Sequence, residues 1–325
     1  MIVPTYWAEA KRTIKHEKRQ MTLRRFGWSD ESQEAAEKHA DKRLEEAVER
    51  VVGGVPTLLA EPKVPYNGAD GLPIREEIVS RHGDAVITRN AYGALCLNTP
   101  DVLFADVDAE SSEGCSPYFY TLLIYSIGYA AVTWQFDEGR SIFLYLLGAI
   151  FFVTVFGSLW HWAIDRIQGS PKQAALKRIE RAAAQHRGWS MRLYETPRGW
   201  RILVSHDTFD PRSDEVRAFF QSIGADPIYV RMCFNQNCFR ARLSPKPWRI
   251  GIDDHLKPRP GVWPVSAERL PDRMRWVNDY QQKSKGYASC RYVTTLGNAV
   301  PCSTAREIIR LHDEMSSAMS EKSIA

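Results

Sequence analysis

The sequence predicts an α+β protein, a mixed-sheet cytosolic domain interrupted by a two-helix transmembrane hairpin. Strand-like runs alternate irregularly with segments of helical pattern, which is typical of the α+β class. Two long stretches without charged residues lie back to back near the middle of the chain. Strand candidates occur on both sides of these stretches, and neither side has enough of them to close a sheet alone. We therefore expect one domain built from both sides.

The composition is that of a globular protein. The chain has 325 residues, of which 25% are charged and 44% hydrophobic. The net charge of +4 does not by itself indicate a nucleic-acid-binding protein. The six cysteines are scattered and no signal peptide precedes them, so we expect reduced thiols in the cytosol. Cys233 and Cys238 lack a second pair at zinc-binding spacing, and zinc is not expected.

Before the uncharged stretches the sequence predicts two helices and three strands. Residues 30–52 have a narrow apolar stripe, with Ser29 as a possible cap and Gly53 at the end. The segment IREEIVSRH is predicted as a short helix. The three strand candidates that follow are DAVITRN, GALCLNT and DVLFADVD.

The second half has a similar mixture. Helices are predicted over 170–187, 214–224, 272–283 and 303–315, and strands over 190–206, 227–244 and 287–295. The strands over 190–206 form a hairpin that turns at Pro197, Arg198 and Gly199. Those over 227–244 form a strand pair that turns near Asn235.

The uncharged stretches are predicted to cross a membrane. Each has about 20 residues, the length that a helix needs to span a bilayer core, and aromatic residues gather at their ends. Lysines and arginines are abundant on both long flanks, whereas the short connection holds only Arg140. The positive-inside rule then places both termini in the cytoplasm. A pair of buried core helices is the alternative.

The chain thus divides into four expected segments: a basic N-terminal arm (1–28), the first part of the cytosolic domain (29–114), the hairpin (115–164, with helices at about 115–134 and 141–164) and the second part of the domain (165–325).

Asp106 and Asp108 are the first candidate site residues. They lie two apart at the end of a predicted buried strand, so their side chains share one face. Two carboxylates on one face favour a cation between them, and Mg²⁺ or Mn²⁺ would suit oxygen ligands. His206 ends a later strand and is a candidate third ligand or base. The alternative is an ordinary solvated strand end.

Basic residues form the second candidate group. Arg240 and Arg242 share one face of a predicted strand, and Lys246 and Arg249 follow in a proline-rich turn. Arginines on a rigid strand suit bidentate binding of phosphate. We add Arg201 to this phosphate-binding set. The alternative is an edge strand with solvated basic residues.

Other common site motifs are absent. The sequence contains no P-loop, no nucleophile elbow, no H-E-x-x-H and no dinucleotide-binding glycine fingerprint. P-loop ATPases, α/β-hydrolases, zincins and simple dehydrogenases are therefore not the leading candidates.

The segments VLFADVDAE and YETPRGWRILVSH together resemble the catalytic core of archaeo-eukaryotic primases and prim-pol proteins. The resemblance implies metal binding by Asp106 and Asp108, and a turn at Thr196, Pro197 and Gly199. The family histidine is missing, because Arg201 and Ile202 stand at its expected position and His206 follows a few residues later. The third acidic ligand would be Asp253 or Asp254. The soluble sequence as a whole also resembles an uncharacterised family of bacterial proteins.

The sequence therefore predicts a protein of the bacterial inner membrane whose cytosolic domain binds Mg²⁺ or Mn²⁺ and a phosphorylated ligand. That ligand would be a nucleotide or a nucleic-acid end, and the activity would be that of a primase- or polymerase-like nucleotidyltransferase. The first alternative is a non-catalytic, membrane-tethered scaffold that touches anionic lipids through its basic segments. The second is a glycosyltransferase with a D-x-D metal site. A homo-oligomer is also expected.

Overall fold

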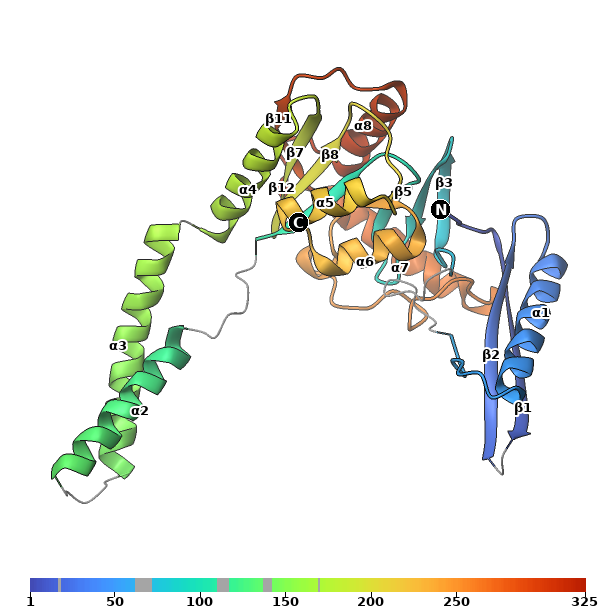
Figure 1. Cartoon of the computed structure of the whole chain (residues 1–325). Helices are drawn as coiled ribbons and strands as arrows, with labels where there is room; N and C mark the ends of the chain where they lie inside the picture. Colours follow the sequence, from blue (N-terminus) through green and yellow to red (C-terminus); the bar gives the residue numbers. More distant parts are fainter. Residues whose placement is uncertain (17–18, 62–71, 110–116, 137–141, 169) are drawn as a thin grey trace.

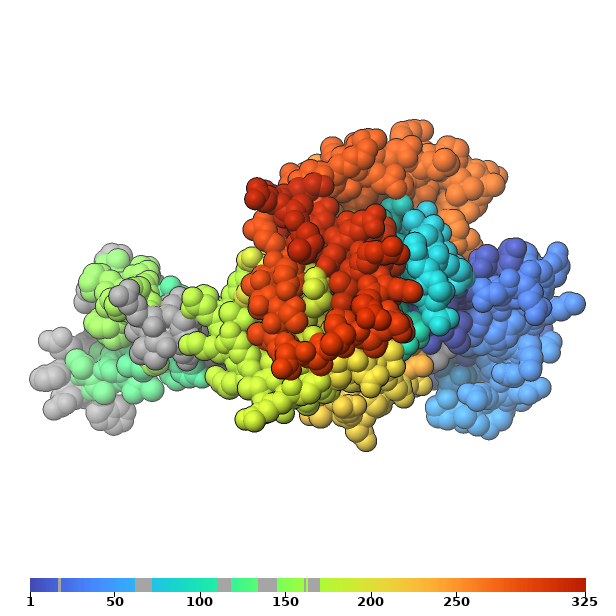
Figure 2. All heavy atoms as spheres, turned by 90° about the horizontal axis from the view of Figure 1, so that it is seen from above, coloured from blue at the N-terminus to red at the C-terminus, as the bar shows by residue number. Residues whose placement is uncertain are grey.

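The computed structural model describes residues 1–16, 19–61, 72–109, 117–136, 142–168 and 170–325. A central α+β body lies between two smaller parts. A β-ribbon with one helix is at one side of the body, and a pair of long helices is at the other (Figure 1). Figure 2 shows the same separation from above, with the ribbon in blue and the helix pair in green at opposite ends.

The ribbon module consists of β1 (Tyr6–His16), β2 (Arg19–Ser29) and α1 (Gln33–Val52). The two strands pair antiparallel over their whole length. The α1 helix begins after Ser32, whose side chain accepts a hydrogen bond from the Ala35 N–H, and not after Ser29 as predicted. Its narrow apolar stripe packs on one face of the ribbon, where a Cβ on Gly27 would lie 2.2 Å from the Ala40 nitrogen.

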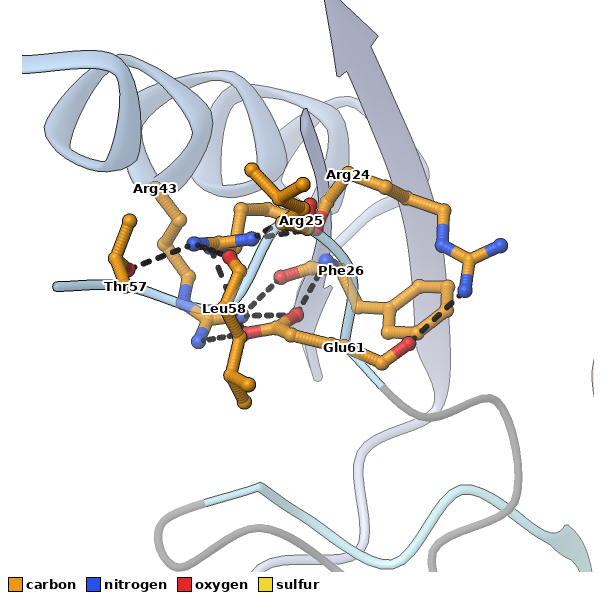
Figure 3. A network of polar contacts seen from close by, with 8 residues as sticks. Arg24, Arg25, Phe26, Arg43, Thr57, Leu58 and Glu61 are labelled. Carbon is orange, nitrogen blue, oxygen red and sulfur yellow. Dashed lines mark hydrogen bonds and ion pairs between the residues drawn. The ribbon is translucent and has the colours of Figure 1, made fainter. Parts of the chain in front are cut away.

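A buried carboxylate fixes the segment after α1 to this module (Figure 3). Glu61 is 7% exposed and forms an ion pair with Arg43 at 2.6 Å, and its other oxygen accepts the Phe26 N–H. Arg25 donates to Thr57 and to the Leu58 carbonyl. Residues 57–61 therefore lie along β2, and both Arg25 and Arg43 are committed to this network.

Two four-stranded sheets form the body. One has the order β3 (Glu77–His82), β4 (Ala85–Arg89), β5 (Leu95–Thr99) and β9 (Phe239–Arg242). The other has the order β11 (Arg291–Gly297), β7 (Ser190–Thr196), β8 (Gly199–Val204) and β6 (Phe104–Asp108). Each sheet thus combines strands from both sides of the uncharged stretches.

Helices cover these sheets and complete the core. They are α4 (Pro171–Gln185), α5 (Asp214–Ile223), α6 (Pro227–Gln236), α7 (Leu270–Ser284) and α8 (Ser303–Ser316). Two short 3₁₀ helices, η2 (Pro247–Arg249) and η3 (Ala267–Arg269), and a small parallel pair, β10 (Tyr287–Ala288) with β12 (Ser323–Ile324), complete the elements. The main core contains apolar residues of both sheets and of α4, α5, α6 and α8.

Two predicted elements are wrong. The segment IREEIVSRH contains strand β3, because pairing with β4 overrides its local helical pattern. The first half of the predicted strand pair over 227–244 is helix α6. Asp226 caps this helix by accepting the Ile228 N–H, and Pro227 occupies its first turn. Only the second half, β9, is a strand.

The uncharged stretches form α2 (Pro117–Phe136) and α3 (Ile142–Gln168), which pack against each other. Among the residues that the structure describes, no helix combines the length and apolar character needed to cross a membrane. This finding corrects the predicted transmembrane hairpin. The prediction counted missing charges, but an uncharged stretch is not always apolar: α2 carries hydroxyl groups on Thr121, Ser126 and Thr133, among others. Localisation in the bacterial inner membrane stays a prediction.

Candidate functional site

A polar cavity of about 140 Å³ lies where the two sheets of the body meet. Strands β6 and β8 supply one wall, and β5 and β9 supply the other. The remaining wall comes from the loop after β4, the start of α6 and the turn at η2. The lining includes six basic side chains and three aspartates. The candidate site residues of the sequence analysis line this cavity, except for His206 and for Asp253 and Asp254, the two candidates for a third acidic ligand.

Asp106 and Arg201 form an ion pair in the wall. They are cross-strand partners in β6 and β8. Arg201 is 1% exposed, and its Nε and Nη2 lie 2.8 and 3.2 Å from the two carboxylate oxygens of Asp106. Its Nη1 donates to the Arg242 carbonyl at 2.7 Å. Burial alone would lower the pKa of Arg201, but the Asp106 carboxylate raises it above its ordinary value. Asp106 therefore neutralises a buried charge.

Asp108 lies at the exposed end of β6, beside the turn between β7 and β8. Its cross-strand partner is Gly199, where an added Cβ would lie 2.1 Å from the Val107 carbonyl oxygen and 2.8 Å from the Ala109 nitrogen. Only glycine permits this approach. The glycine of the T-P-R-G turn thus has a structural reason: it lets the turn close against the strand that carries the aspartates.

Arg240 is a second buried arginine with its own carboxylate. It is 4% exposed, and its Nη2 lies 2.8 and 2.6 Å from the two oxygens of Glu76. Glu76 also accepts from Thr88 at 2.6 Å. Glu76 therefore supplies the counter-charge of Arg240, which is one of the residues that line the cavity.

The other four basic residues of the lining lie close together: Arg198, Arg242, Lys246 and Arg249. Burial, followed by the charges of Arg242, Arg249 and Arg198, lowers the pKa of Lys246. Burial and the charges of Arg242 and Arg198 likewise lower the pKa of Arg249.

The charge of Asp108 acts in the opposite direction and raises the pKa values of both Lys246 and Arg249. The Asp108 carboxylate therefore lies near these two residues. The four cations, defined here as the cationic cluster, thus repel one another around a single space. An anion in the cavity would relieve this repulsion.

Aromatic rings stand beside the cationic cluster. Tyr92 lines the cavity, and burial raises its pKa to about 12. Its ring meets that of Trp248 edge to face, with centroids 5.4 Å apart. Trp248 is 53% exposed, and the Lys246 ammonium lies 5.4 Å from its ring centroid. A large exposed aromatic ring thus adjoins the charged space.

His206 does not line the cavity. It lies beyond the opposite end of β8, where its ring is 5.1 Å from that of Trp189, and burial lowers its pKa. Asp253 and Asp254 are exposed residues outside the cavity lining.

The residues present do not fit a metal ion held by the protein alone. Asp106 is paired with Arg201, and Asp226, the third aspartate of the lining, accepts the Ile228 N–H at the start of α6. Within the described part of the chain, no group of three or more His, Cys, Asp or Glu side chains is arranged to hold a metal. Binding of Mg²⁺ or Mn²⁺ stays a prediction without a ligand set.

Sequence reasoning missed several lining residues, among them Arg198, Tyr92 and Asp226. Arg198 was interpreted only as a turn residue, and its place near Asp108 follows from the pairing of β6 with β8. Tyr92 lies in the loop after β4, and Asp226 is the N-cap of α6. Tertiary packing brings both residues to the cavity, so no local pattern indicates them. No family model, curated protein or solved structure matches the chain.

Proposed function

We propose that the cavity binds the phosphate of a nucleotide or of a nucleic-acid end. The cationic cluster is the observation that carries this proposal: its four basic residues line the cavity together, and burial and the neighbouring arginines lower the pKa values of Lys246 and Arg249. Arginine side chains bind phosphate through paired, charge-assisted hydrogen bonds. The cavity volume of about 140 Å³ suits a phosphate group, with the rest of the ligand outside it.

The exposed ring of Trp248 favours a nucleotide over a simple phosphate. Stacking of a base on an aromatic side chain contributes about 1–3 kcal/mol and tolerates any base. Trp248 and Lys246 lie in the same turn, so a ligand held by the cluster would extend past the ring. The proposal concerns binding. A nucleotidyltransferase reaction would need the metal site discussed above, for which the described residues supply no ligand set.

Binding is tested by calorimetric titration of pyrophosphate and ATP into the parent protein and into Arg242→Gln and Arg249→Gln. Each substitution removes a charged hydrogen-bond donor and should weaken both ligands about tenfold or more. Arg306→Gln/Arg310→Gln is the matched control, because both arginines are exposed on α8 outside the cavity. Equal affinities in the parent and the cavity variants would refute the proposal.

The Trp248→Ala variant separates the contribution of base stacking to affinity from that of the phosphate contacts. It should weaken ATP binding by about tenfold and leave pyrophosphate binding unchanged. Equal effects on both ligands would show that the ring does not stack on a base. Titration of Mn²⁺ with and without ATP, into the parent and Asp108→Asn, tests the metal prediction separately.

A further inference from the structure

One face of the β-ribbon carries basic and hydrogen-bonding side chains away from the cavity. Along this face the cross-strand pairs are Lys11 with Arg24, Thr13 with Thr22, and Lys15 with Gln20. The two threonine hydroxyls lie 2.9 Å apart, which confirms that both point to the same side. All except Arg24 are exposed, and the Arg24 Nη2 donates to the Glu61 carbonyl at 3.0 Å. We call these six residues the ribbon face. Glu9, two positions before Lys11, is the one exposed carboxylate on this side of β1 among the described residues.

The opposite face of the ribbon packs on α1. Ala10 and Leu23 are buried there against Ala40 and Leu44. The outer surface of α1 is mainly acidic, since its exposed residues include Glu34, Glu37, Asp41, Glu45, Glu46 and Glu49. The module is therefore polarised, with acidic groups outside the helix and basic groups on the ribbon face.

The ribbon face is open toward the end of the ribbon where β1 connects to β2. Nearer the body, the same face continues with Trp7 and Phe26, and the Arg75 guanidinium covers their rings at 5.4 and 4.0 Å. Beyond them the ribbon reaches away from the body (Figure 1). Lys11 and Arg24 are like charges on directly opposite positions, an arrangement that costs stability. Glu9 supplies one negative charge on the same face, and Lys15 lies farther along it toward the turn between β1 and β2.

We propose that the ribbon face binds the phosphate backbone of double-stranded DNA. A two-stranded ribbon fits the major groove of B-DNA, and lysine, arginine, threonine and glutamine are common donors to phosphate oxygens. The A-form major groove of duplex RNA is too narrow for such an element.

The composition of the ribbon face argues against single-stranded nucleic acid and membranes as its ligands. The six residues of the ribbon face include no aromatic ring on which an unpaired base could stack. They also include no large apolar side chain to insert among lipid headgroups, so only electrostatic attraction would hold this face on an anionic membrane. The interaction does not depend on the cavity, because none of these residues lines it.

The test uses the full chain and a short fluorescein-labelled DNA duplex, followed by anisotropy over a series of salt concentrations. Three phosphate contacts, from Lys11, Lys15 and Arg24, predict a slope of log K against log salt of roughly −2.7. Lys11→Gln/Lys15→Gln should reduce it to roughly −0.9 and weaken binding at low salt. Both lysines are exposed, so the fold should persist, and thermal unfolding checks this.

Lys38→Gln/Lys42→Gln is the matched control. It removes the same charge from exposed positions on α1, on the other side of the module, and should leave the slope unchanged. Equal losses in both double variants would attribute binding to net charge and overturn the proposal, as would absence of duplex binding by the parent.

Vesicles of phosphatidylcholine with phosphatidylserine are titrated in parallel. Vesicle binding that needs Lys11 and Lys15, with duplex binding unaffected by their loss, would assign the face to lipid instead. Arg242→Gln should weaken the binding of ATP and leave the binding of the DNA duplex unchanged. A failure of this inference can therefore be distinguished from a failure of the cavity proposal.

Discussion

Replacing Asp106 by asparagine tests the interpretation of the carboxylate pair most directly. Asparagine has nearly the same shape but no charge, and it retains only one oxygen that can accept a hydrogen bond. Arg201 would remain 1% exposed beside it, having lost a carboxylate that accepts at 2.8 and 3.2 Å. The prediction is a loss of folding stability, independent of any ligand.

The magnitude follows from the burial of the two partners. Removing one partner of a fully buried ion pair costs about 3–5 kcal/mol. The Asp106 side chain is 33% exposed, so solvent screens part of the pair, and one hydrogen bond survives in the variant. We expect a decrease in the free energy of unfolding of about 2–3 kcal/mol. For a chain of this size, the melting temperature should fall by about 4–10 °C.

Urea unfolding followed by tryptophan fluorescence measures this change. Asp108→Asn is the matched control, since Asp108 lies two positions along the same strand but is exposed, and it should cost less than about 1 kcal/mol. In an Arg201→Met background, Asp106→Asn should cost less than about 0.5 kcal/mol because no buried charge remains. A full stability loss in that background, or none in the single variant, would refute the pairing argument.

Three further predictions concern other parts of the molecule. Gly199→Ala should cost about 1–3 kcal/mol in thermal or urea unfolding, because its Cβ would lie 2.1 Å from the Val107 carbonyl oxygen, whereas Gly188→Ala, with nothing within 4 Å, should not. Affinity for pyrophosphate should fall as pH rises through the pKa of Lys246, which burial and nearby arginines hold below 10.5, and Lys246→Met should lose this dependence in titrations across alkaline pH. A Lys246→Met protein with the parent's pH profile would contradict the assignment. Glu61→Gln leaves two arginines without their counter-charge, so we expect about 2 kcal/mol lower stability and faster hydrogen exchange along β2; unchanged exchange would show that the network is not needed.

Local signals in the sequence were sufficient for several elements. The strands before the uncharged stretches have alternating or continuous apolar runs bounded by turn residues, and they form β4, β5 and β6. Helix α5 ends at Gly224, whose φ of 66° lies in the left-handed region that favours glycine. The turn of the β7–β8 hairpin was located correctly from its proline and glycine. In these places local conformation and tertiary packing agree.

Other elements depended on partners that are distant in sequence. The β3 segment has a helical pattern but pairs with β4. Helix α6 was missed because an apolar run with cysteines and aromatics resembles a strand, and its cap, Asp226, went unnoticed. The transmembrane hairpin was predicted from absent charge, a weaker criterion than apolar character.

Sequence patterns were enough to indicate which residues could meet at a site: two aspartates at the end of one strand, and arginines and a lysine in and after another. Their roles depend on the tertiary structure. The fold brings β6, β8 and β9 together. Arg201 forms a buried ion pair with Asp106, and Arg240 forms one with Glu76. Sequence spacing carries no information about such pairing, because the free energy of a buried charge depends on which opposite charge lies beside it in space. The other four basic residues of the lining lie near one another with Asp108 beside them, and this arrangement supports the proposed anionic ligand.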